Sequence, residues 1–295
     1  MPFAAPNFDT VEAYDGSHKI ALMRLPGRRK SLAAPQNALA SRSSFRMPIV
    51  ERREFFLPDL DPVHDGLKVA HLTDIHVGRS TPARRVLDAV AKANLFAPDL
   101  TVLTGDYLSH HERGLGLLRE QFSGLRGSVV AVLGNHDHWV DPGGALSVLQ
   151  SFGYAVLRNQ NTTLSLRGAP FTVVGIDDLV TENHDVPAAF AGAREGSRLV
   201  LAHAPRTAEL LTGFRASLCL AGHTHGGHVN LPKVTVAIMR RLREHYLAGR
   251  FHVEDTQLYV SRGIGGAVMP FRINAPPEVT LITLRSLHPD MRRAA

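Results

Sequence analysis

Five short apolar runs, each followed by a cluster of polar residues, constrain the fold of this chain more than any other feature. The runs span residues 67–72, 99–104, 128–133, 198–202 and 217–221. The clusters that follow them are Asp74-Ile75-His76, Gly105-Asp106, Gly134-Asn135-His136-Asp137, His203-Ala204-Pro205 and Gly222-His223-Thr224-His225. Short apolar runs bounded in this way are typical of buried strands. Because sites in α/β sheets form at the carboxyl ends of strands, we expect the clusters to share one site.

Helical segments separate the first three runs. Thr81 is predicted as an N-cap and Pro82 as the first helical residue, and an apolar stripe then continues from Val86 to Ala93. Further helices are predicted over 114–125, 143–152 and 206–213. Further strands are predicted over 49–57, 154–157, 163–167, 171–176, 258–261 and 279–284, the first of them at a sheet edge. Strands that alternate with helices predict an α/β fold with some parallel pairing.

Composition and charge indicate one globular domain. The 295 residues carry a net charge of +6, which fits a solvated surface, an anionic substrate or a membrane surface. The single cysteine, Cys219, excludes an internal disulfide and lies in a strand-like run as a small core residue. We find no convincing signal peptide and no run near the ~18 apolar residues of a membrane-spanning helix. We expect a loosely ordered extension over 1–47, one domain over 48–286, a tail over 287–295 and a cytoplasmic location.

The five clusters together supply seven oxygen and nitrogen donors and no thiolate. The donors are Asp74, His76, Asp106, Asn135, His203, His223 and His225. Two divalent cations that share one bridging carboxylate need about this many protein ligands, and the mixture suits Mn, Fe, Zn or Ni better than Ca or Mg. Taken singly, each of three donors has another interpretation: Asp106 as a helix cap, Asn135 as a turn residue and His203 as a buried histidine. Five clusters at five strand ends argue against coincidence.

In each pair at spacing i, i+2, an extended backbone points both side chains the same way.

These motifs and their order resemble those of the calcineurin-like metallophosphoesterases, over about residues 67–284. The segment 259–265, with Pro276-Pro277-Glu278 after it, is similar to the YkuE/YaeI-type bacterial phosphoesterases. The resemblance implies a four-layer α/β/β/α sandwich with a dinuclear site at one sheet edge. It implies that Asp74, His76 and His225 hold one cation, that Asn135, His203 and His223 hold the other, and that Asp106 bridges them. It also implies that His136 is catalytic and is not a ligand.

The implied reaction is phosphoester hydrolysis by a hydroxide held between the two cations, with in-line attack on phosphorus. His136 donates a proton or a hydrogen bond to the leaving oxygen. In the protein phosphatase branch, an aspartate and an arginine follow the Gly-Asp motif where Ser109 and His110 stand here. The acidic partner of His136 and a clamp for a phosphomonoester dianion are therefore absent. We expect a diester or a pyrophosphate among small or lipid-linked phosphoesters as the substrate. His110, His111, His138 and Trp139 are candidates to contact a second ester substituent.

Two other functions stay open from the sequence. A non-catalytic scaffold on the same fold would have a vestigial site, whereas none of the seven ligands is missing here. A nuclease needs a basic groove with aromatic residues for stacking, and the chain is 6% aromatic with one tryptophan. We therefore do not expect nucleic acid as a partner.

A basic, apolar segment follows the last motif, over residues 234–247. Val236, Met239, Leu242 and Tyr246 recur at helical spacing, and Arg240, Arg241 and Arg243 fall between them. The segment is interpreted either as a surface helix packed on the core or as an amphipathic flap. A flap of this kind would hold an apolar or anionic substrate near the cations, or make peripheral contact with a membrane.

Overall fold

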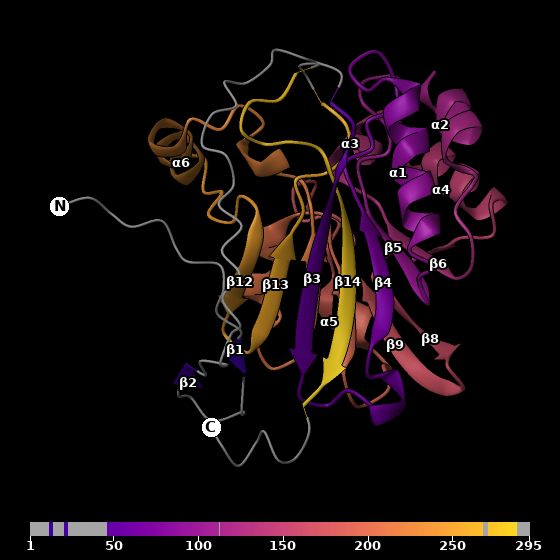
Figure 1. Ribbon diagram of the computed structural model, residues 1–295, viewed down its shortest axis with the longest axis vertical. Helices are drawn as coiled ribbons and strands as arrows, with labels where there is room; N and C mark the ends of the chain where they lie inside the picture. The colour runs from indigo at the N-terminus through magenta and orange to yellow at the C-terminus, as the bar shows by residue number, and fades with distance from the viewer. Residues whose placement is uncertain (1–11, 14–20, 23–45, 112, 268–270, 288–295) are drawn as a thin grey trace, which may run out of the picture.

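Two six-stranded sheets lie face to face in the computed structural model (Figure 1). The structure describes residues 12–13, 21–22, 46–111, 113–267 and 271–287. The expected extension over 1–47 and tail over 287–295 lie almost wholly outside the described residues, so the predicted domain limits stay a prediction. Within the described extension, β1 (Glu12–Ala13) pairs antiparallel with β2 (Ala21–Leu22). No helix of the described chain has both the length and the apolar character needed to span a membrane.

The first large sheet is mostly parallel. Its order is β3 (Ile49–Leu57), β14 (Glu278–Ser286), β4 (Leu67–Leu72), β5 (Leu100–Thr104), β6 (Val129–Val132) and β7 (Ala155–Val156). Strands β4 to β7 run parallel, whereas β14 pairs antiparallel with β4 and parallel with β3. The strand predicted over 49–57 is β3, and it lies at the sheet edge as expected.

The second large sheet has a parallel centre and antiparallel edges. Its order is β12 (Gly249–Val253), β13 (Thr256–Val260), β11 (Leu218–Ala221), β10 (Arg198–Leu201), β9 (Ala169–Gly175) and β8 (Gln160–Leu166). Strands β13, β11, β10 and β9 run parallel, and β12 and β8 pair antiparallel at the two edges. The sequence did not predict β12.

Helices cover the outer face of each sheet. The first sheet carries α1 (Ala83–Leu95), α2 (Gly114–Phe122) and α4 (Pro142–Ser151), and the second carries α5 (Val186–Phe190) and a 3₁₀ helix over Pro205–Leu210. The shorter α3 (Asn135–Val140) and the peripheral α6 (Pro232–Arg241) stand at the upper end in Figure 1. Single 3₁₀ turns lie at Pro62–His64 and His225–Gly227. The predicted α/β/β/α sandwich of four layers is confirmed.

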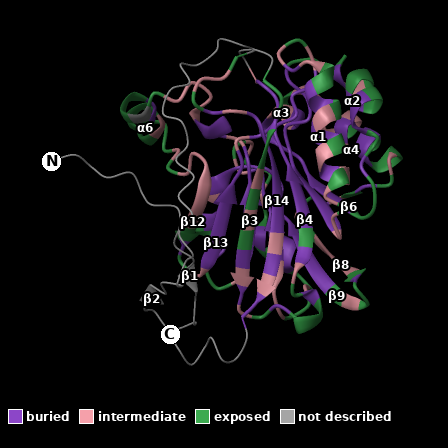
Figure 2. Cartoon of the chain, viewed as in Figure 1, coloured by how far each residue is buried: buried purple, intermediate pink, exposed green. Residues whose placement is uncertain are grey.

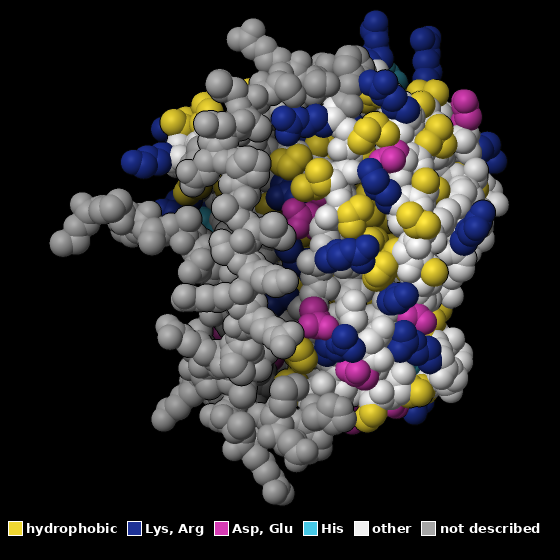
Figure 3. Space-filling view, in the orientation of Figure 1, with side chains coloured by type: hydrophobic (Ala, Val, Ile, Leu, Met, Phe, Trp, Pro, Cys, Tyr) yellow, Lys and Arg dark blue, Asp and Glu magenta, His cyan; other side chains and the backbone are white. Residues whose placement is uncertain are grey.

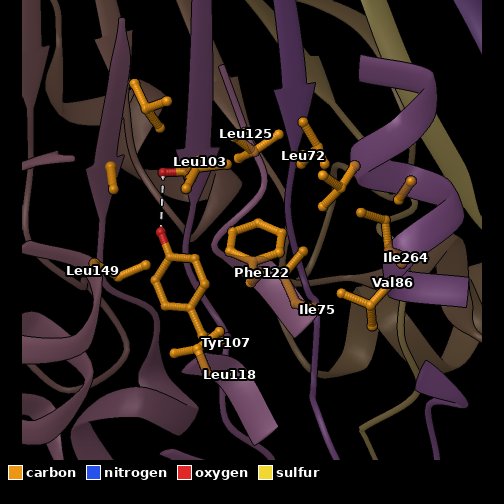
Figure 4. Packing of buried hydrophobic residues seen from close by; sticks show 14 of the residues in the cluster. Leu72, Ile75, Val86, Leu103, Tyr107, Leu118, Phe122, Leu125, Leu149 and Ile264 are labelled. Carbon is orange, nitrogen blue, oxygen red and sulfur yellow. Dashed lines mark hydrogen bonds between the residues drawn. The ribbon is translucent and has the colours of Figure 1, made fainter. Parts of the chain in front are cut away.

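Three apolar clusters hold the layers together, and Figure 2 shows that most strand residues are buried. The central cluster joins side chains such as Val102 and Leu201 from the inner faces of the two sheets. The first outer cluster packs α1, α2 and α4 on the first sheet (Figure 4), and the hydroxyl of Tyr107 there donates to the Leu103 carbonyl at 3.4 Å. Cys219 is fully buried as expected, and burial raises the pKa of its thiol to about 12.

The start of α1 differs from the sequence prediction. The helix begins at Ala83, Pro82 occupies the N-cap position and no side chain caps the helix. The Thr81 hydroxyl instead accepts the Gly266 N–H at 3.1 Å. The prediction was wrong because a bond to a distant loop satisfies the hydroxyl that the sequence assigned to the helix end.

Candidate metal centre

All seven predicted ligands come together at the edge where the strands of both sheets end. Their positions follow β4, β5 and β6 of the first sheet and β10 and β11 of the second, as the sequence predicted. Six of the side chains are buried and His223 is half-buried. Asn135 and His136 belong to α3, which is labelled at the upper end of the sheets in Figure 1.

The backbone at these residues is turned and not extended. Five predicted ligands have left-handed φ values: 51° at Asp74, 46° at His76, 56° at Asp106, 71° at His223 and 53° at His225. The expectation that each i, i+2 pair lies on an extended chain was therefore wrong. Residues other than glycine adopt this conformation at a cost of free energy, and such strain concentrates at functional sites. The turn sends His223 and His225 to different parts of the site.

The first group of donor atoms surrounds His225. Its Nε2 lies 3.2 Å from Asp74 Oδ1 and 3.1 Å from His76 Nε2. His76 Nε2 in turn lies 3.4 Å from Asp106 Oδ2. Four donors thus face one small volume between the two sheets.

The second group surrounds His203. Its Nε2 lies 3.2 Å from Asp106 Oδ2 and 3.3 Å from His223 Nδ1. His223 Nδ1 also lies 2.9 Å from Asn135 Oδ1. The same oxygen of Asp106 therefore lies next to both groups.

These distances fit two cations with one shared ligand. Nitrogen and oxygen donors bind a cation such as Zn²⁺ at ~2.0–2.2 Å, which places neighbouring donors ~3 Å apart. The distances within the two groups range from 2.9 to 3.4 Å, apart from the 4.0 Å between His76 Nε2 and Asp74 Oδ1. The division of the ligands between two cations that the family resemblance implied stays a prediction.

Hydrogen bonds outside the two groups orient the imidazole rings. The Nδ1–H of His76 donates to the Leu108 carbonyl at 3.0 Å, and the Nδ1–H of His203 donates to the Thr104 carbonyl at 2.7 Å. Such bonds select the tautomer whose Nε2 is free to bind a cation. His225 differs, because the Arg272 guanidinium donates to its Nδ1 at 2.8 Å. Because a guanidinium can only donate, Nδ1 of His225 accepts and the ring proton lies on Nε2.

Burial and the charges of neighbouring residues determine which side chains of the site are protonated. Burial lowers the pKa of His76 to about 3 and that of His223 to about 4, which keeps both rings neutral. Burial also raises the pKa of Asp74 to about 6. At His203, burial lowers the pKa, but the charge and hydrogen bond of Asp106 and the charges of Asp74 and Asp178 together outweigh burial and raise the pKa to about 10. Without cations, the proton on His203 balances part of the carboxylate charge.

Asp137 is a site residue whose role sequence reasoning missed. Its buried carboxylate accepts four backbone N–H bonds, from Asp106, Tyr107 and Gly134 at 2.9 Å and from Leu108 at 3.0 Å. The carboxylate thereby joins the loop after β5 to the loop after β6. Its place two residues after Asn135 in a polar cluster was the available signal.

His136 lies beside the ligands and is held by a backbone atom. Its Nδ1–H donates to the Ser109 carbonyl at 2.8 Å, and its backbone N–H donates to Asp106 Oδ1 at 2.9 Å. The position where the sequence lacks an acidic partner thus supplies a main-chain acceptor instead. A ring nitrogen of His136 lies within 4.8 Å of ligand atoms of His76 and Asp106. Its assignment as catalytic and not as a ligand stays a prediction.

Comparisons with known proteins agree with this geometry. The family model described as calcineurin-like phosphoesterase matches residues 67–227. The chain is 32% identical over 234 residues to the uncharacterized metallophosphoesterase YkuE of Bacillus subtilis, covering 75% of this chain and 80% of that protein. It is 30% identical over 276 residues to the phosphodiesterase YaeI of Escherichia coli, covering 87% and 98% of the two chains. A third relative, YkoQ of Bacillus subtilis, is 27% identical over 229 residues, covering 74% and 84%. The chain therefore belongs to the calcineurin-like phosphoesterase family and is a metal-dependent phosphoesterase.

Proposed function

We propose that the protein is a dinuclear hydrolase of small or lipid-linked phosphoesters that prefers diesters or pyrophosphates. The observation that carries the proposal is the position of Asp106 Oδ2, 3.4 Å from His76 Nε2 in one donor group and 3.2 Å from His203 Nε2 in the other. A carboxylate shared in this way suits two divalent cations, with Mn, Fe, Zn and Ni as candidates.

Residues of this chain can supply each function that the proposed reaction needs. The seven predicted ligands would hold the cations, which would activate water and withdraw charge from the phosphoryl group when bound. His136 keeps its Nδ1–H on the Ser109 carbonyl, so its Nε2 is the atom that can give a proton to the leaving oxygen. The carbonyl fixes the ring in place of the aspartate of the protein phosphatases.

The surroundings of His136 support a substrate with a second organic substituent. A cavity of about 550 Å³ is lined by His110, His111, Arg113, Trp139 and Val140. The ring centroids of Trp139 and His110 lie 5.0 and 5.6 Å from that of His136, and Trp139 is 62% exposed. Flat exposed rings beside the proton donor can stack on a leaving group. His138 is turned elsewhere, because its Nε2 contacts Asp177 Oδ1 at 2.7 Å.

The alternatives have less support. A non-catalytic scaffold has no need for seven donors that each lie within 3.4 Å of another one. A nuclease would place stacking aromatics along a groove, whereas the cavity beside His136 holds a single tryptophan. The relative YaeI is named a phosphodiesterase, which agrees with a diester substrate. The cytoplasmic location expected from the sequence stays a prediction.

The test is a comparison of kcat/KM for bis-(p-nitrophenyl) phosphate, p-nitrophenyl phosphate and a phosphoserine peptide, with Mn²⁺ supplied. We expect the diester to be cleaved fastest and the peptide slowest. A preference for the peptide would contradict the proposed substrate class. Equal rates on the first two would contradict the diester preference while leaving phosphoesterase activity intact. Metal analysis of the purified protein gives the number and identity of the cations.

A further inference from the structure

Helix α6 presents an apolar face to solvent. Leu231, Val234, Ile238 and Leu242 recur at intervals of three, four and four residues, which places them along one side of a helix. Between 50 and 63% of each side chain is exposed. In Figure 3, hydrophobic side chains gather with Lys and Arg at the upper left, where Figure 1 shows α6. The sequence had placed Val236 on the apolar side, but it too is exposed, so the helix contacts the core less than expected.

Basic residues surround this apolar face. Lys233, Arg240, Arg241 and Arg243 are all exposed, and Glu244, the one acidic residue of the segment 231–245, is turned inward. Its Oε1 lies 3.9 Å from His223 Nε2. The exposed surface of α6 therefore carries both an apolar stripe and four positive charges.

The inner side of α6 is attached to the turn that carries the predicted ligands. Thr235 is buried, and its hydroxyl donates to the Val229 carbonyl and accepts the Leu231 N–H, both at 2.8 Å. The Thr235 methyl group packs so closely on Gly227 that no side chain fits there. Gly227 ends the 3₁₀ turn that starts at His225. Whatever binds the outer face of α6 is thus held next to the metal centre.

We propose that α6 docks the protein on a bilayer surface that carries anionic lipid headgroups. The apolar stripe enters the boundary between headgroups and acyl chains, and the flanking cations pair with lipid phosphates. Ten residues span about 15 Å, which is half the thickness of the hydrocarbon core, so α6 lies along the surface. The inference rests on the proposed function in one respect: docking brings lipid-linked phosphoesters to the metal centre.

The positive charge of α6 favours a bilayer over a second copy of this chain as the partner that covers the apolar stripe. In a twofold dimer the same patch meets itself, so the arginines of one α6 would face those of the other. Like charges brought together in this way oppose association. An anionic surface satisfies both the apolar stripe and the four positive charges.

Vesicle co-sedimentation of the full metal-loaded chain tests the proposal. We expect binding to phosphatidylcholine vesicles that contain phosphatidylglycerol, little binding to phosphatidylcholine alone, and weakening of binding by salt. The variant Arg240→Gln/Arg241→Gln/Arg243→Gln should bind about a hundredfold more weakly, because each basic residue contributes about fivefold near such a surface. The variant Val234→Ser/Ile238→Ser should lose at least about tenfold.

Matched controls keep the result specific. Leu95→Ser changes an 87% exposed leucine at the end of α1, and Arg126→Gln removes an exposed charge away from α6. Both controls should bind vesicles like the wild type. All variants should hydrolyse soluble bis-(p-nitrophenyl) phosphate at the wild-type rate, which shows that they are folded. An inactive wild type that still binds vesicles would contradict the proposed function and not the docking.

Three results would overturn the docking proposal. One is absence of binding to anionic vesicles at low salt, and another is binding that neither α6 variant weakens. The third is a dimer in sedimentation velocity that both α6 variants dissociate, since the second copy would then be the occupant.

Discussion

Asp106 is the residue on which both halves of the predicted metal centre depend. Its Oδ2 lies next to His76 in one donor group and His203 in the other, and its Oδ1 accepts the backbone N–H of His136. The charge of Asp106 also holds a proton on His203, whose pKa it raises. One carboxylate thus links both cation positions to the predicted proton donor.

Replacing Asp106 and His136 should separate metal binding from proton donation. Asp106→Asn should lower the content of both cations and the rate together, because one residue serves both positions. His136→Ala should keep the metal content while kcat falls on the order of 10²–10⁴-fold, as expected for loss of a general acid. Metal analysis and kcat on the same preparations check both outcomes. Parallel loss of metal and rate in His136→Ala would mean that His136 is a ligand.

Among single residues, the donor side chains of the predicted metal centre were easier to predict than the groups that orient them. The seven donors could be identified because each follows a strand-like run. The Ser109 carbonyl that holds His136 could not be identified, because every residue has a carbonyl and only tertiary structure selects one. Asp137 was visible in its motif, but its four backbone bonds depend on two loops meeting. Arg272 lies in no recognisable pattern, yet it contacts His225.

At the scale of elements, the loops after the strands touch one another through glycines. A Cβ on Gly222 would collide with the Thr73 hydroxyl and with Asp74 Oδ2. This close approach lets the backbone N–H of His223 reach both carboxylate oxygens of Asp74, at 3.2 and 3.1 Å. The loop after β4 and the loop after β11 therefore fit only while residue 222 has no side chain.

Gly222→Ala should weaken metal binding and activity, because the added methyl group pushes Asp74 away from His225. We expect a loss of at least about 1–3 kcal/mol in folding stability, as for other overpacked sites. Gly116→Ala is the matched control: Gly116 is an exposed position inside α2, with nothing near its Cβ. This control should gain about 0.5–1 kcal/mol and keep full activity. Urea unfolding and metal analysis measure both effects, and a Gly222→Ala protein with normal metal content would refute the close-packing argument.

The elements themselves were predicted best where one physical signal dominates. The strand over 67–72 is found at the predicted residues, because an apolar run buried between layers at every position except Lys68 has few alternatives. The helix over 206–213 was predicted too long and is a 3₁₀ helix over Pro205–Leu210. Strand β12 and the five-residue α5 were missed. Both are short, and pairing with β13 or packing on β8 and β9 decides their structure more than local pattern does.

At the scale of the whole molecule, the predicted metal centre joins the two sheets. Asp74, His76 and Asp106 follow strands of the first sheet, and His203 and His225 follow strands of the second. Cations held by all of these residues would connect the two layers outside the apolar core. Binding of the cations then contributes to the stability of the sandwich, because the unfolded chain offers no such site.

Metal-loaded protein should therefore melt at a higher temperature than chelator-treated protein near pH 7, and the gap should close as the pH falls. Burial lowers the pKa of His76 to about 3 and that of His223 to about 4, whereas both titrate near pKa ~6.5 in the unfolded chain. For these two groups the unfolded state binds more protons than the native state between these values, so their contribution to stability is lost as the pH falls below ~6.5, in the loaded and the chelated protein alike.

The pKa of Asp74, raised to about 6 by burial, acts in the opposite direction in the chelated protein. Between about pH 6 and about pH 4, the Asp74 carboxyl binds a proton in the native state but not in the unfolded state. Protonation of Asp74 therefore stabilises the native state of the chelated protein over this range. Bound cations keep Asp74 ionised and remove that compensation, so the loaded protein should lose more stability over the same range. Thermal melts with and without chelator across about pH 4–7 measure the gap. Asp106→Asn serves as the control, with a small gap at every pH. A gap that stays constant down to about pH 4 would show that bound cations do not keep Asp74 ionised, which would contradict its predicted role as a ligand.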